Sequence, residues 1–343
     1  MELKQIVEPL IKWYEQEGRK LPWREGKNPY HIWISEIMLQ QTKIEAVKKY
    51  YDRFIQELPT IQDLAKVEED KLLKLWEGLG YYNRARNLKK AAIQIEEKFN
   101  GKMPKTYQDL ITLAGIGEYT AGAISSIAFN QKVPAVDGNV LRVLSRVTKS
   151  KKDVLLPETK KEMTRKIQEI LPKQAGTFNE AIMELGETIC IPNGEPLCDK
   201  CPLVNICLAK KENLVMQIPV RVKKTKRKKE EITVFLLKYK NKIAIQKREQ
   251  NGLLAGMYEF PNQKEKMTKK KLEEYLKQKK IIGKNIKKVG THKHIFTHIE
   301  WNMTAYEIET QEELKGYLWI QQKDLKNKYA LPTAFAVFQK YIK

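Results

Sequence analysis

Apolar residues recur at helical spacing along the first two thirds of the chain. The segment at residues 2–18 has the pattern of an amphipathic helix, and breakers such as proline and glycine separate it from later segments of the same kind. This pattern predicts that residues 1 to about 212 are almost entirely helical. The apolar positions fall in three sets: Leu3, Ile6, Val7, Leu10, Ile11 and Tyr14; Ile44, Val47, Tyr51, Phe54 and Leu58; Leu88, Ala92, Ile95 and Phe99.

The pattern changes after a basic segment that contains few core-forming side chains and is expected to be a linker. Beyond it, the β-rich runs at 232–239 and 242–248 predict a hairpin, and residues 292–308 alternate in the same way. Helical patterns follow Thr268 and Pro332. The sequence therefore predicts three parts: a helical domain at 1–218, a basic interdomain linker at 219–231 and a smaller α+β domain at 232–343.

The balance of charge changes the expectation about partners. The 343 residues carry 64 Lys and Arg against 42 Asp and Glu, a formal net charge of +22. This excess favours a polyanion such as nucleic acid, although a generally lysine-rich composition would give the same number. Charges interrupt the apolar run at the N-terminus, and no run reaches the ~20 apolar residues of a membrane span. We expect a soluble, intracellular protein.

Residues 113–123, LAGIGEYTAGA, have the pattern of a helix end, a glycine loop and the start of a second helix. Gly115 and Gly117 allow a positive φ or the close approach of another backbone. Backbone N–H groups at the start of the second helix would make a phosphate site, although an ordinary interhelical turn has the same pattern. Tyr119 stands on the first turn of the second helix, where a ligand bound at the loop would meet it.

All four cysteines lie within eighteen residues, at Cys190, Cys198, Cys201 and Cys207, with seven, two and five residues between them. A disulfide framework is not expected in an intracellular protein, and four thiolates in one loop need a cation to offset their repulsion. Structural zinc usually takes two C-x-x-C pairs, and only one gap here is that short. The spacing alone therefore leaves zinc and a cubane iron–sulfur cluster open.

With this hairpin and this cysteine run, the segment LPWREGKNPYHIWISEIMLQQT at 21–42 resembles the adenine DNA glycosylase family of the helix-hairpin-helix superfamily. The resemblance extends through LWEGLGYYNRARNL, VPAVDGNVLRVLSR and FNEAIMELG. It implies a mainly α helix-hairpin-helix glycosylase domain with an iron–sulfur loop, followed by a smaller α+β Nudix-like domain. It favours a 4Fe-4S cluster over zinc, although the first cysteine gap has seven residues where the family usually has six.

The resemblance implies hydrolysis of the N-glycosidic bond of adenine mispaired with 8-oxoguanine or guanine in double-stranded DNA. Protonating the departing base calls for a carboxyl group whose pKa is raised by burial, and Glu36 stands among apolar neighbours. Asp137, at an expected helix N-cap, would stay ionised and stabilise positive charge at C1′. Asn139 would orient the water or the sugar. Tyr119 stands where the strand-cleaving branch of the superfamily has a lysine, so the enzyme would be monofunctional.

The same resemblance supplies expected DNA contacts. Gln41 and Tyr81 would fill the gap left by a base flipped out of the duplex, although Tyr81 could equally be a core residue. Phe296, Thr297 and His298 correspond to the family loop that recognises 8-oxoguanine. The complete expected set, in which Trp23, Arg24 and Glu180 hold the adenine, is Trp23, Arg24, Leu39, Gln41, Thr42, Leu79, Tyr81, Gly115, Gly117, Glu180, Phe296, Thr297 and His298.

Three other functions would need features that the sequence lacks or would leave some of its features unused. An endonuclease III-like lyase needs a lysine nucleophile, and none occupies the helix turn after Gly117. A protein that only binds damaged DNA would not need both Glu36 and Asp137. A Nudix hydrolase needs a metal-binding glutamate helix, which KKKLEEYLKQKK does not supply, so the second domain is expected to bind and not to hydrolyse. We further expect a monomer, no membrane partner and a cytoplasmic, nucleoid-associated location.

Overall fold

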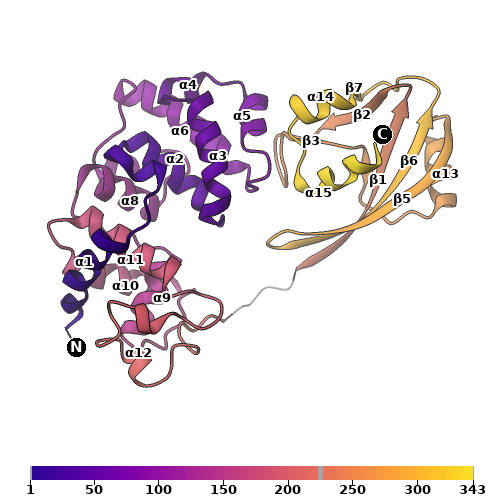
Figure 1. Cartoon of the computed structure of the whole chain (residues 1–343). Coiled ribbons are helices and arrows are strands. Elements are labelled where there is room, and N and C mark those ends of the chain that lie inside the picture. Colours follow the sequence, from indigo (N-terminus) through magenta and orange to yellow (C-terminus); the bar gives the residue numbers. More distant parts are fainter. Residues whose placement is uncertain (1, 223–226, 343) are drawn as a thin grey trace. The chain divides into compact units, whose positions relative to one another are not determined.

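The computed structural model describes residues 2–222 and 227–342 (Figure 1). Packing divides the chain into two compact units, one of Met1–Lys66 with Asn87–Lys223 and one of Val67–Arg86 with Lys224–Lys343. Val67–Arg86, which the sequence expectation placed within the helical domain, is grouped with the C-terminal part.

The first unit is helical, as expected. Among the described residues of the chain, no helix combines the length and the apolarity needed to cross a membrane. The elements of this unit are η1 (Leu3–Ile6), α1 (Val7–Glu17), η2 (Pro22–Lys27), α2 (Pro29–Leu39), α3 (Ile44–Glu57), α4 (Ile61–Lys66), α6 (Asn83–Phe99, whose first turn belongs to the second unit), α7 (Tyr107–Leu110), α8 (Glu118–Phe129), α9 (Gly138–Val147), α10 (Pro157–Ile170), α11 (Ala175–Thr188), η3 (Cys198–Lys200) and α12 (Leu208–Lys211).

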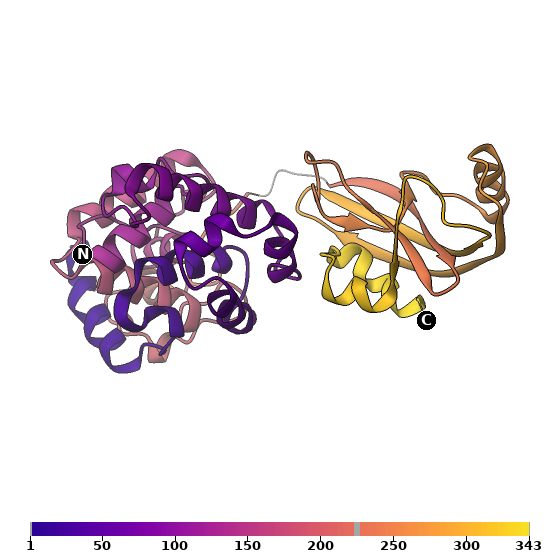
Figure 2. The same ribbon diagram turned by 90° about the horizontal axis from the view of Figure 1, so that it is seen from above.

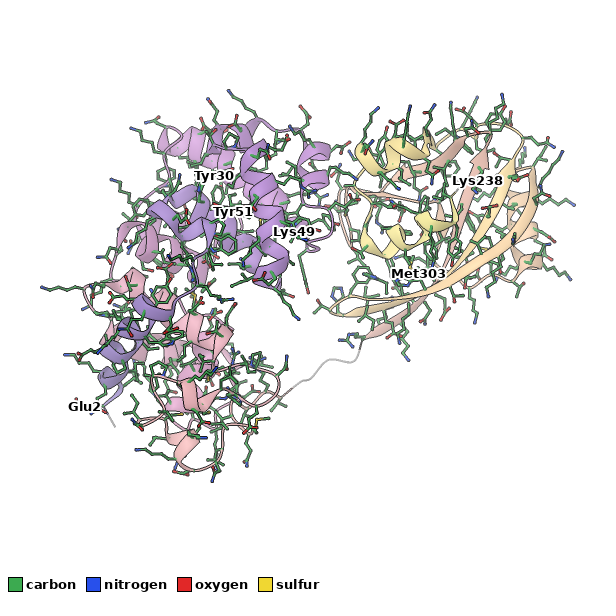
Figure 3. The ribbon with its side chains drawn as sticks, in the orientation of Figure 1. Glu2, Tyr30, Lys49, Tyr51, Lys238 and Met303 are labelled. Carbon is green, nitrogen blue, oxygen red and sulfur yellow. The ribbon has the colours of Figure 1, made fainter. Side chains whose placement is uncertain are left out.

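The amphipathic pattern of α3 becomes a buried stripe on one face of the helix. Ile44, Val47, Tyr51 and Phe54 are buried, whereas Lys49 is exposed (Figure 3). Fully burying an aliphatic or aromatic side chain stabilises the fold by roughly 1.5–3 kcal/mol. This gain exceeds what intrinsic helix propensity supplies, so packing of the stripe fixes the position of the helix.

Helix α2 is buried on nearly all sides. Asn28 caps it by accepting a hydrogen bond from the Tyr30 backbone N–H at 2.9 Å, and Pro29 occupies the first turn. Every residue from 32 to 38 is buried, including the polar Ser35 and Glu36. A helix that is apolar all round belongs in the core of a protein, and α2 thereby carries a carboxyl group into the interior.

Two glycines allow the loop before α9 to approach its neighbours closely. A Cβ on Gly122 of α8 would lie 2.2 Å from the Pro134 carbonyl oxygen. A Cβ on Gly186 of α11 would lie 2.6 Å from the Cβ of Asn139. Because no side chain fits at either place, these glycines allow the segment that carries Asp137 to pack directly against both helices.

The second unit is built on a mixed sheet with the strand order β3-β2-β1-β6-β5, to which β4 adds beside β1 and β7 beside β2. The strands β1 and β2 form the expected antiparallel hairpin, and β1 and β6 run parallel. The elements are α5 (Glu69–Leu75), β1 (Lys228–Tyr239), β2 (Lys242–Lys247), β3 (Tyr258–Glu259), β4 (Asn262–Gln263), α13 (Lys269–Gln278), β5 (Gly283–Ile295), β6 (Ile299–Thr310), β7 (Leu318–Gln321), α14 (Gln322–Asn327), α15 (Thr333–Ala336) and η4 (Val337–Tyr341).

Helices cover both faces of this sheet (Figure 2). Alternate residues of β1 point to opposite faces of the sheet. Val234 belongs to the hydrophobic cluster that includes Phe335 of α15, and Phe235 belongs to the cluster that includes Leu272 of α13. A strand that is covered on both faces has apolar residues at consecutive positions. This explains the nearly continuous apolar run ITVFLLKY at 232–239.

Three sequence expectations in this unit need adjustment. The alternating segment 292–308 is two strands, because the chain turns at 296–298 between β5 and β6. Strand β1 begins at Lys228, inside the expected linker 219–231, since its first residues pair with β6. Residues 223–226 of that linker lie outside the described residues. The helical pattern after Pro332 becomes one short α-helix followed by a 3-10 turn.

Candidate active site

A cavity of about 480 Å³ opens in the first unit, lined by residues of η2, α2, α8, α9 and α11. These elements come from distant parts of the sequence and meet around the buried helix α2. The cavity brings together nine of the residues expected to bind or react with adenine: Trp23, Arg24, Glu36, Leu39, Gln41, Tyr119, Asp137, Asn139 and Glu180.

Glu36 projects from α2 into this cavity. Its side chain is almost fully buried, and the Tyr119 hydroxyl donates a 2.6 Å hydrogen bond to Oε2. Burial raises the pKa of Glu36 to about 7, as the sequence reasoning required, although the bond from Tyr119 opposes the rise. A large fraction of this carboxyl is therefore protonated near neutral pH, with Oε1 left to carry the proton.

The Tyr119 hydroxyl is directed at Glu36 of α2. The first turn of α8 packs against α2, so the phenol reaches the carboxyl of that helix. Burial and the neighbouring carboxylates raise the pKa of Tyr119 well above its ordinary value, so the phenol remains a hydrogen-bond donor.

Asp137 is the N-cap of α9, as predicted. Its Oδ1 accepts hydrogen bonds from the backbone N–H groups of Asn139 at 2.9 Å and Val140 at 2.8 Å, and its Oδ2 accepts one from the Asn139 amide at 2.7 Å. Burial raises the pKa of Asp137, and the hydrogen bonds to Asn139 and Val140 oppose this rise.

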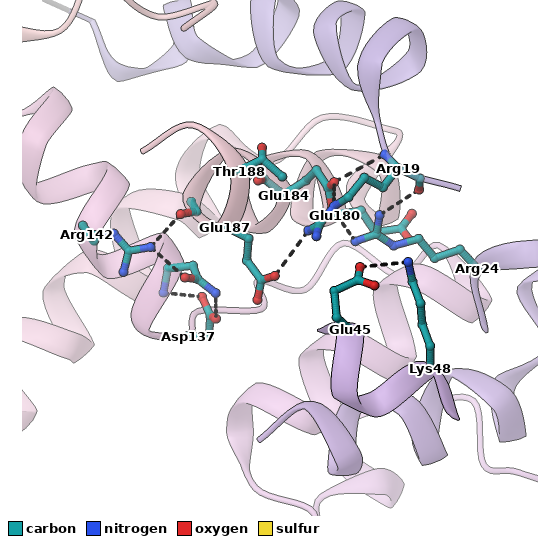
Figure 4. A network of polar contacts seen from close by, with 12 residues as sticks. Arg19, Arg24, Glu45, Lys48, Asp137, Arg142, Glu180, Glu184, Glu187 and Thr188 are labelled. Atoms are coloured by element: carbon teal, nitrogen blue, oxygen red, sulfur yellow. Dashed lines mark hydrogen bonds and ion pairs between the residues drawn. The ribbon is translucent and has the colours of Figure 1, made fainter. Parts of the chain in front are cut away.

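A ladder of charged side chains forms one wall of the cavity (Figure 4). Arg24 pairs with Glu180 at 3.4 Å (Nε to Oε1) and with Glu184 at 2.9 Å (Nη2 to Oε2). Arg19 pairs with the other oxygen of Glu184 and, through Nη2 at 3.3 Å, with Glu187. The guanidinium groups of Arg19 and Arg24 lower the pKa of Glu184 by more than burial raises it. This carboxylate therefore stays ionised. The ladder holds Arg24 and Glu180 in fixed positions.

Part of this wall was not among the residues expected from the sequence. Met183, Glu184 and Glu187 also line the cavity, and Arg19 stands behind them. Counted from Glu180 on α11, these positions are i+3, i+4 and i+7, which share one face of a helix. This spacing was available in the sequence and would have placed both acids beside Glu180.

Arg142 of α9 connects Asn139, beside the Asp137 cap, to the cysteine segment. Its Nη2 donates to the Asn139 side-chain oxygen at 2.8 Å and to the Gly186 carbonyl at 2.7 Å. Its Nε donates to the Cys190 carbonyl at 2.7 Å. One guanidinium therefore joins the amide that touches Asp137 to the first residue of the cysteine loop.

The four cysteines line a second, smaller cavity. The Nη1 of Arg146 lies 3.2 Å from the sulfur of Cys190 and supplies a positive charge beside it. Burial raises the pKa of Cys201 to about 12, and it also raises those of Cys198 and Cys207. In the described parts of the chain, no three His, Cys, Asp or Glu side chains are already arranged as ligands of a single metal ion. The donor set itself, four sulfurs and a guanidinium around one cavity, fits a thiolate-bound cation.

The two glycines of the loop before α8 differ in how much space surrounds them. Gly115 has φ of +74°, and a Cβ there would lie 2.6 Å from the Cβ of Asn87. Gly117 is the N-cap of α8 with φ of −97°, and a Cβ there would meet nothing within 4 Å. Gly115 is thus required by the fold, whereas Gly117 leaves open space in front of the helix N-terminus.

Comparison with known proteins follows the same division of the chain. Residues 34–173 match the family described as HhH-GPD superfamily base excision DNA repair protein, and residues 233–340 match the NUDIX domain. The chain is 37% identical to the adenine DNA glycosylase of Buchnera aphidicola subsp. Schizaphis graminum (strain Sg), with 93% of each chain covered. It is 31% identical to the adenine DNA glycosylase of Homo sapiens, covering 96% of this chain and 73% of the relative. The chain belongs to the adenine DNA glycosylase family.

Solved structures agree with this membership. A thermostable thymine-DNA glycosylase aligns with a TM-score of 0.55 and 28% identity over 61% of this chain and 96% of its own. Endonuclease III in a non-covalent DNA complex aligns with a TM-score of 0.52 and 26% identity over 62% of this chain and 99% of its own. The protein is therefore a DNA glycosylase of the helix-hairpin-helix fold that carries a Nudix-like domain, which confirms the fold and the family expected from the sequence.

Tyr81 and the residues 296–298, expected from the sequence to contact DNA, belong to the second unit. Tyr81 is 48% exposed with φ of +48°, which argues against a core role. Its hydroxyl lies 2.9 Å from the Thr297 hydroxyl, in the turn between β5 and β6. Thr297 and His298 are both exposed. Two of the expected contact residues, distant in sequence, thus meet at one surface.

Other residues of the expected set lie in less accessible positions. Phe296 packs edge-on against the buried Trp301 of β6, with 4.9 Å between ring centroids. This contact anchors the turn to the sheet. Leu79 is buried. Thr42 lies outside the cavity lining and bonds its hydroxyl to the Gln40 carbonyl at 3.4 Å. Their contacts with a substrate stay predictions.

Proposed function

We propose that this protein is a monofunctional adenine DNA glycosylase that hydrolyses the N-glycosidic bond of adenine mispaired with 8-oxoguanine or guanine. One observation carries the proposal. A single cavity holds a buried carboxyl with a pKa near neutrality, Glu36, together with the capped carboxylate of Asp137 and the Arg24–Glu180 pair.

These groups divide the chemistry between them. The Glu36 carboxyl gives its proton to a ring nitrogen of adenine as the bond to C1′ breaks, and the bonding electrons leave with the base. The Asp137 carboxylate stabilises the positive charge that develops on the sugar, and water then adds at C1′. Asn139, fixed by Arg142, holds Asp137 in orientation. Trp23, beside Arg24, supplies an aromatic wall for the base.

The same cavity supports hydrolysis without strand cleavage. A lyase attacks the sugar with an amine, and a phenol cannot form an imine. Among the described residues that line the cavity, none is a lysine. Tyr119 occupies the position at which the strand-cleaving branch of the superfamily has its lysine. Tyr119 is engaged with Glu36, so it assists the acid.

Duplex DNA is the partner that fits the rest of the molecule. The net charge of +22 offsets phosphates, and the open N-terminus of α8 at Gly117 offers N–H groups to one of them. Gln41, exposed with φ of +60°, and Tyr81 would occupy the space of the flipped adenine. We assign recognition of 8-oxoguanine to Thr297 and His298.

The cysteine cavity would hold a 4Fe-4S cluster through Cys190, Cys198, Cys201 and Cys207. Such a cluster would crosslink the C-terminal end of the helical domain. The proposed domains are 1–218 for catalysis, a linker from 219 to the start of β1, and a Nudix-like binding domain. The monomeric state and the cytoplasmic, nucleoid-associated location stay predictions.

The test is an adenine-release assay with the purified full-length protein. Duplexes carry adenine opposite 8-oxoguanine, guanine or thymine, and products are analysed before and after alkali. We expect base loss opposite 8-oxoguanine and guanine only, with strand breaks appearing only after alkali. Strand cleavage without alkali, or no base loss from either mispair, would contradict the proposal.

A second arm of the assay tests the turn at 296–298 between β5 and β6. His298→Ala should reduce the preference for 8-oxoguanine over guanine and leave excision opposite guanine unchanged. Thr291→Ala, exposed on the neighbouring strand β5, is the matched control and should keep the preference. Equal behaviour of the two variants would remove His298 from the recognition site.

A further inference from the structure

Glu187 is a carboxylate of the catalytic cavity for which the chemistry above has no role. It lies one helical turn beyond Glu184 on the face of α11 that lines the cavity. Its side chain is 37% exposed and is tethered by the Nη2 of Arg19 at 3.3 Å. In the view of Figure 4, Glu187 stands between Arg19 and Asp137, away from the Arg24–Glu180 pair.

The backbone around Glu187 fixes this placement. The preceding residue, Gly186, is the one whose missing Cβ allows Asn139 to pack against α11. The carbonyl of Gly186 accepts a hydrogen bond from Arg142, which in turn holds Asn139. Glu187 therefore directly follows the residue of α11 against which Asn139, the partner of Asp137, is packed.

We propose that Glu187 is a positioning residue of the glycosylase reaction: it places a second negative charge beside Asp137 and acts through that carboxylate on the cation forming at C1′. The inference rests on the proposed function. A negative charge repels the phosphates of bound DNA in the ground state and attracts the sugar cation in the transition state. It therefore favours the transition state over the bound substrate.

The electrostatic surroundings of Asp137 agree with this role. The groups that interact with it are Glu36 of α2, Tyr119 of α8, Arg142 of α9 and Glu187. Glu187 adds to the burial that raises the pKa of Asp137, and Arg142 is the one cation in this set. A cation forming beside the two carboxylates offsets the repulsion between them.

The experiment compares Glu187→Gln with the unmodified full-length protein in single-turnover adenine release across pH 4–9, alongside binding to a duplex that cannot be cleaved. We expect the rate to fall about twofold to fivefold, the range for charge interactions of partly exposed groups. The acidic limb of the profile should move to lower pH, because the pKa of Asp137 falls when the neighbouring charge is removed. Binding should be equal or tighter.

Two further variants separate charge from structure. Glu187→Asp keeps the charge and should keep the position of the acidic limb. Glu169→Gln, an exposed glutamate of α10 paired at 3.7 Å with Arg165, is the matched control and should behave as the unmodified protein. An unchanged rate and profile for Glu187→Gln would overturn the inference, as would slower release with weaker binding and an unmoved limb. Failure of the unmodified protein to release adenine would instead overturn the proposed function.

Discussion

Replacing Glu36 by glutamine should strongly slow adenine release and at the same time stabilise the protein. Glutamine keeps the size of the side chain and can still accept the hydrogen bond from Tyr119, but it has no proton to give. General acid catalysis contributes about 10²–10⁴-fold, so release should fall by that factor while duplex binding remains. In the unmodified protein, release should also decline above about pH 7, as Glu36 loses its proton.

The stabilisation follows from the raised pKa. An ordinary value of 4.5 becomes about 7 in the folded protein, so folding disfavours the ionised form. The cost is absent below about pH 4.5, grows as the pH rises to 7, and is constant above that value. At about 1.4 kcal/mol for each pH unit, it reaches about 3 kcal/mol at pH 8 and stays below about 1 kcal/mol at pH 5.

Denaturant unfolding of both proteins at pH 5 and pH 8 measures this difference. Glu36→Gln should have the higher free energy of unfolding at pH 8, with a much smaller advantage at pH 5. Glu158→Gln, an exposed glutamate of α10, serves as control and should show no pH-dependent difference. An equal advantage at both pH values would refute the burial argument, and near-normal release by Glu36→Gln would refute its role as the acid.

Other predictions follow from the neighbouring geometry. Gly186→Ala should displace Asn139, since the new Cβ would lie 2.6 Å from it, and slow release about tenfold to hundredfold in single-turnover kinetics; an unchanged rate would show that the loop can shift without cost. The purified protein should be brown and contain iron, and Cys201→Ser should lose the colour; a colourless active protein with zinc in elemental analysis contradicts the cluster. Tyr119→Lys should gain strand-nicking activity and a borohydride-trapped adduct with DNA, and native protein that already gives both would be a lyase.

Local patterns explain why much of the site could be predicted. The N-cap at Asp137, the glycine at 115 and the cysteine run each depend on a few consecutive residues. Glu36 was assigned from its apolar neighbours within one helix, and the burial of α2 agrees with that assignment. The family resemblance then supplied roles that spacing alone could not, such as the shared assignment of Trp23, Arg24 and Glu180 to the adenine.

What could not be predicted depends on contacts between distant residues. Arg19 and Glu184 are 165 positions apart, so no local signal joins them. The pKa of Asp137 depends on how deeply the fold buries its cap, which a capping motif does not reveal. The packing of Val67–Arg86 with the C-terminal part rests on contacts such as that of Asp70 with Lys247, formed between segments that sequence patterns treat separately.

The burial of α2 has a consequence for how motion is distributed. Amides in a helix with no solvent-exposed face exchange with deuterium only when a large part of the unit opens, whereas exposed turns exchange through local fluctuations. The backbone around Glu36 should therefore be among the slowest to exchange, and the turns at Tyr81 and Thr297 among the fastest. If Glu36 is the acid we propose, it is held still while the exposed turns proposed to meet the duplex can adapt, so the nucleotide must move to the acid.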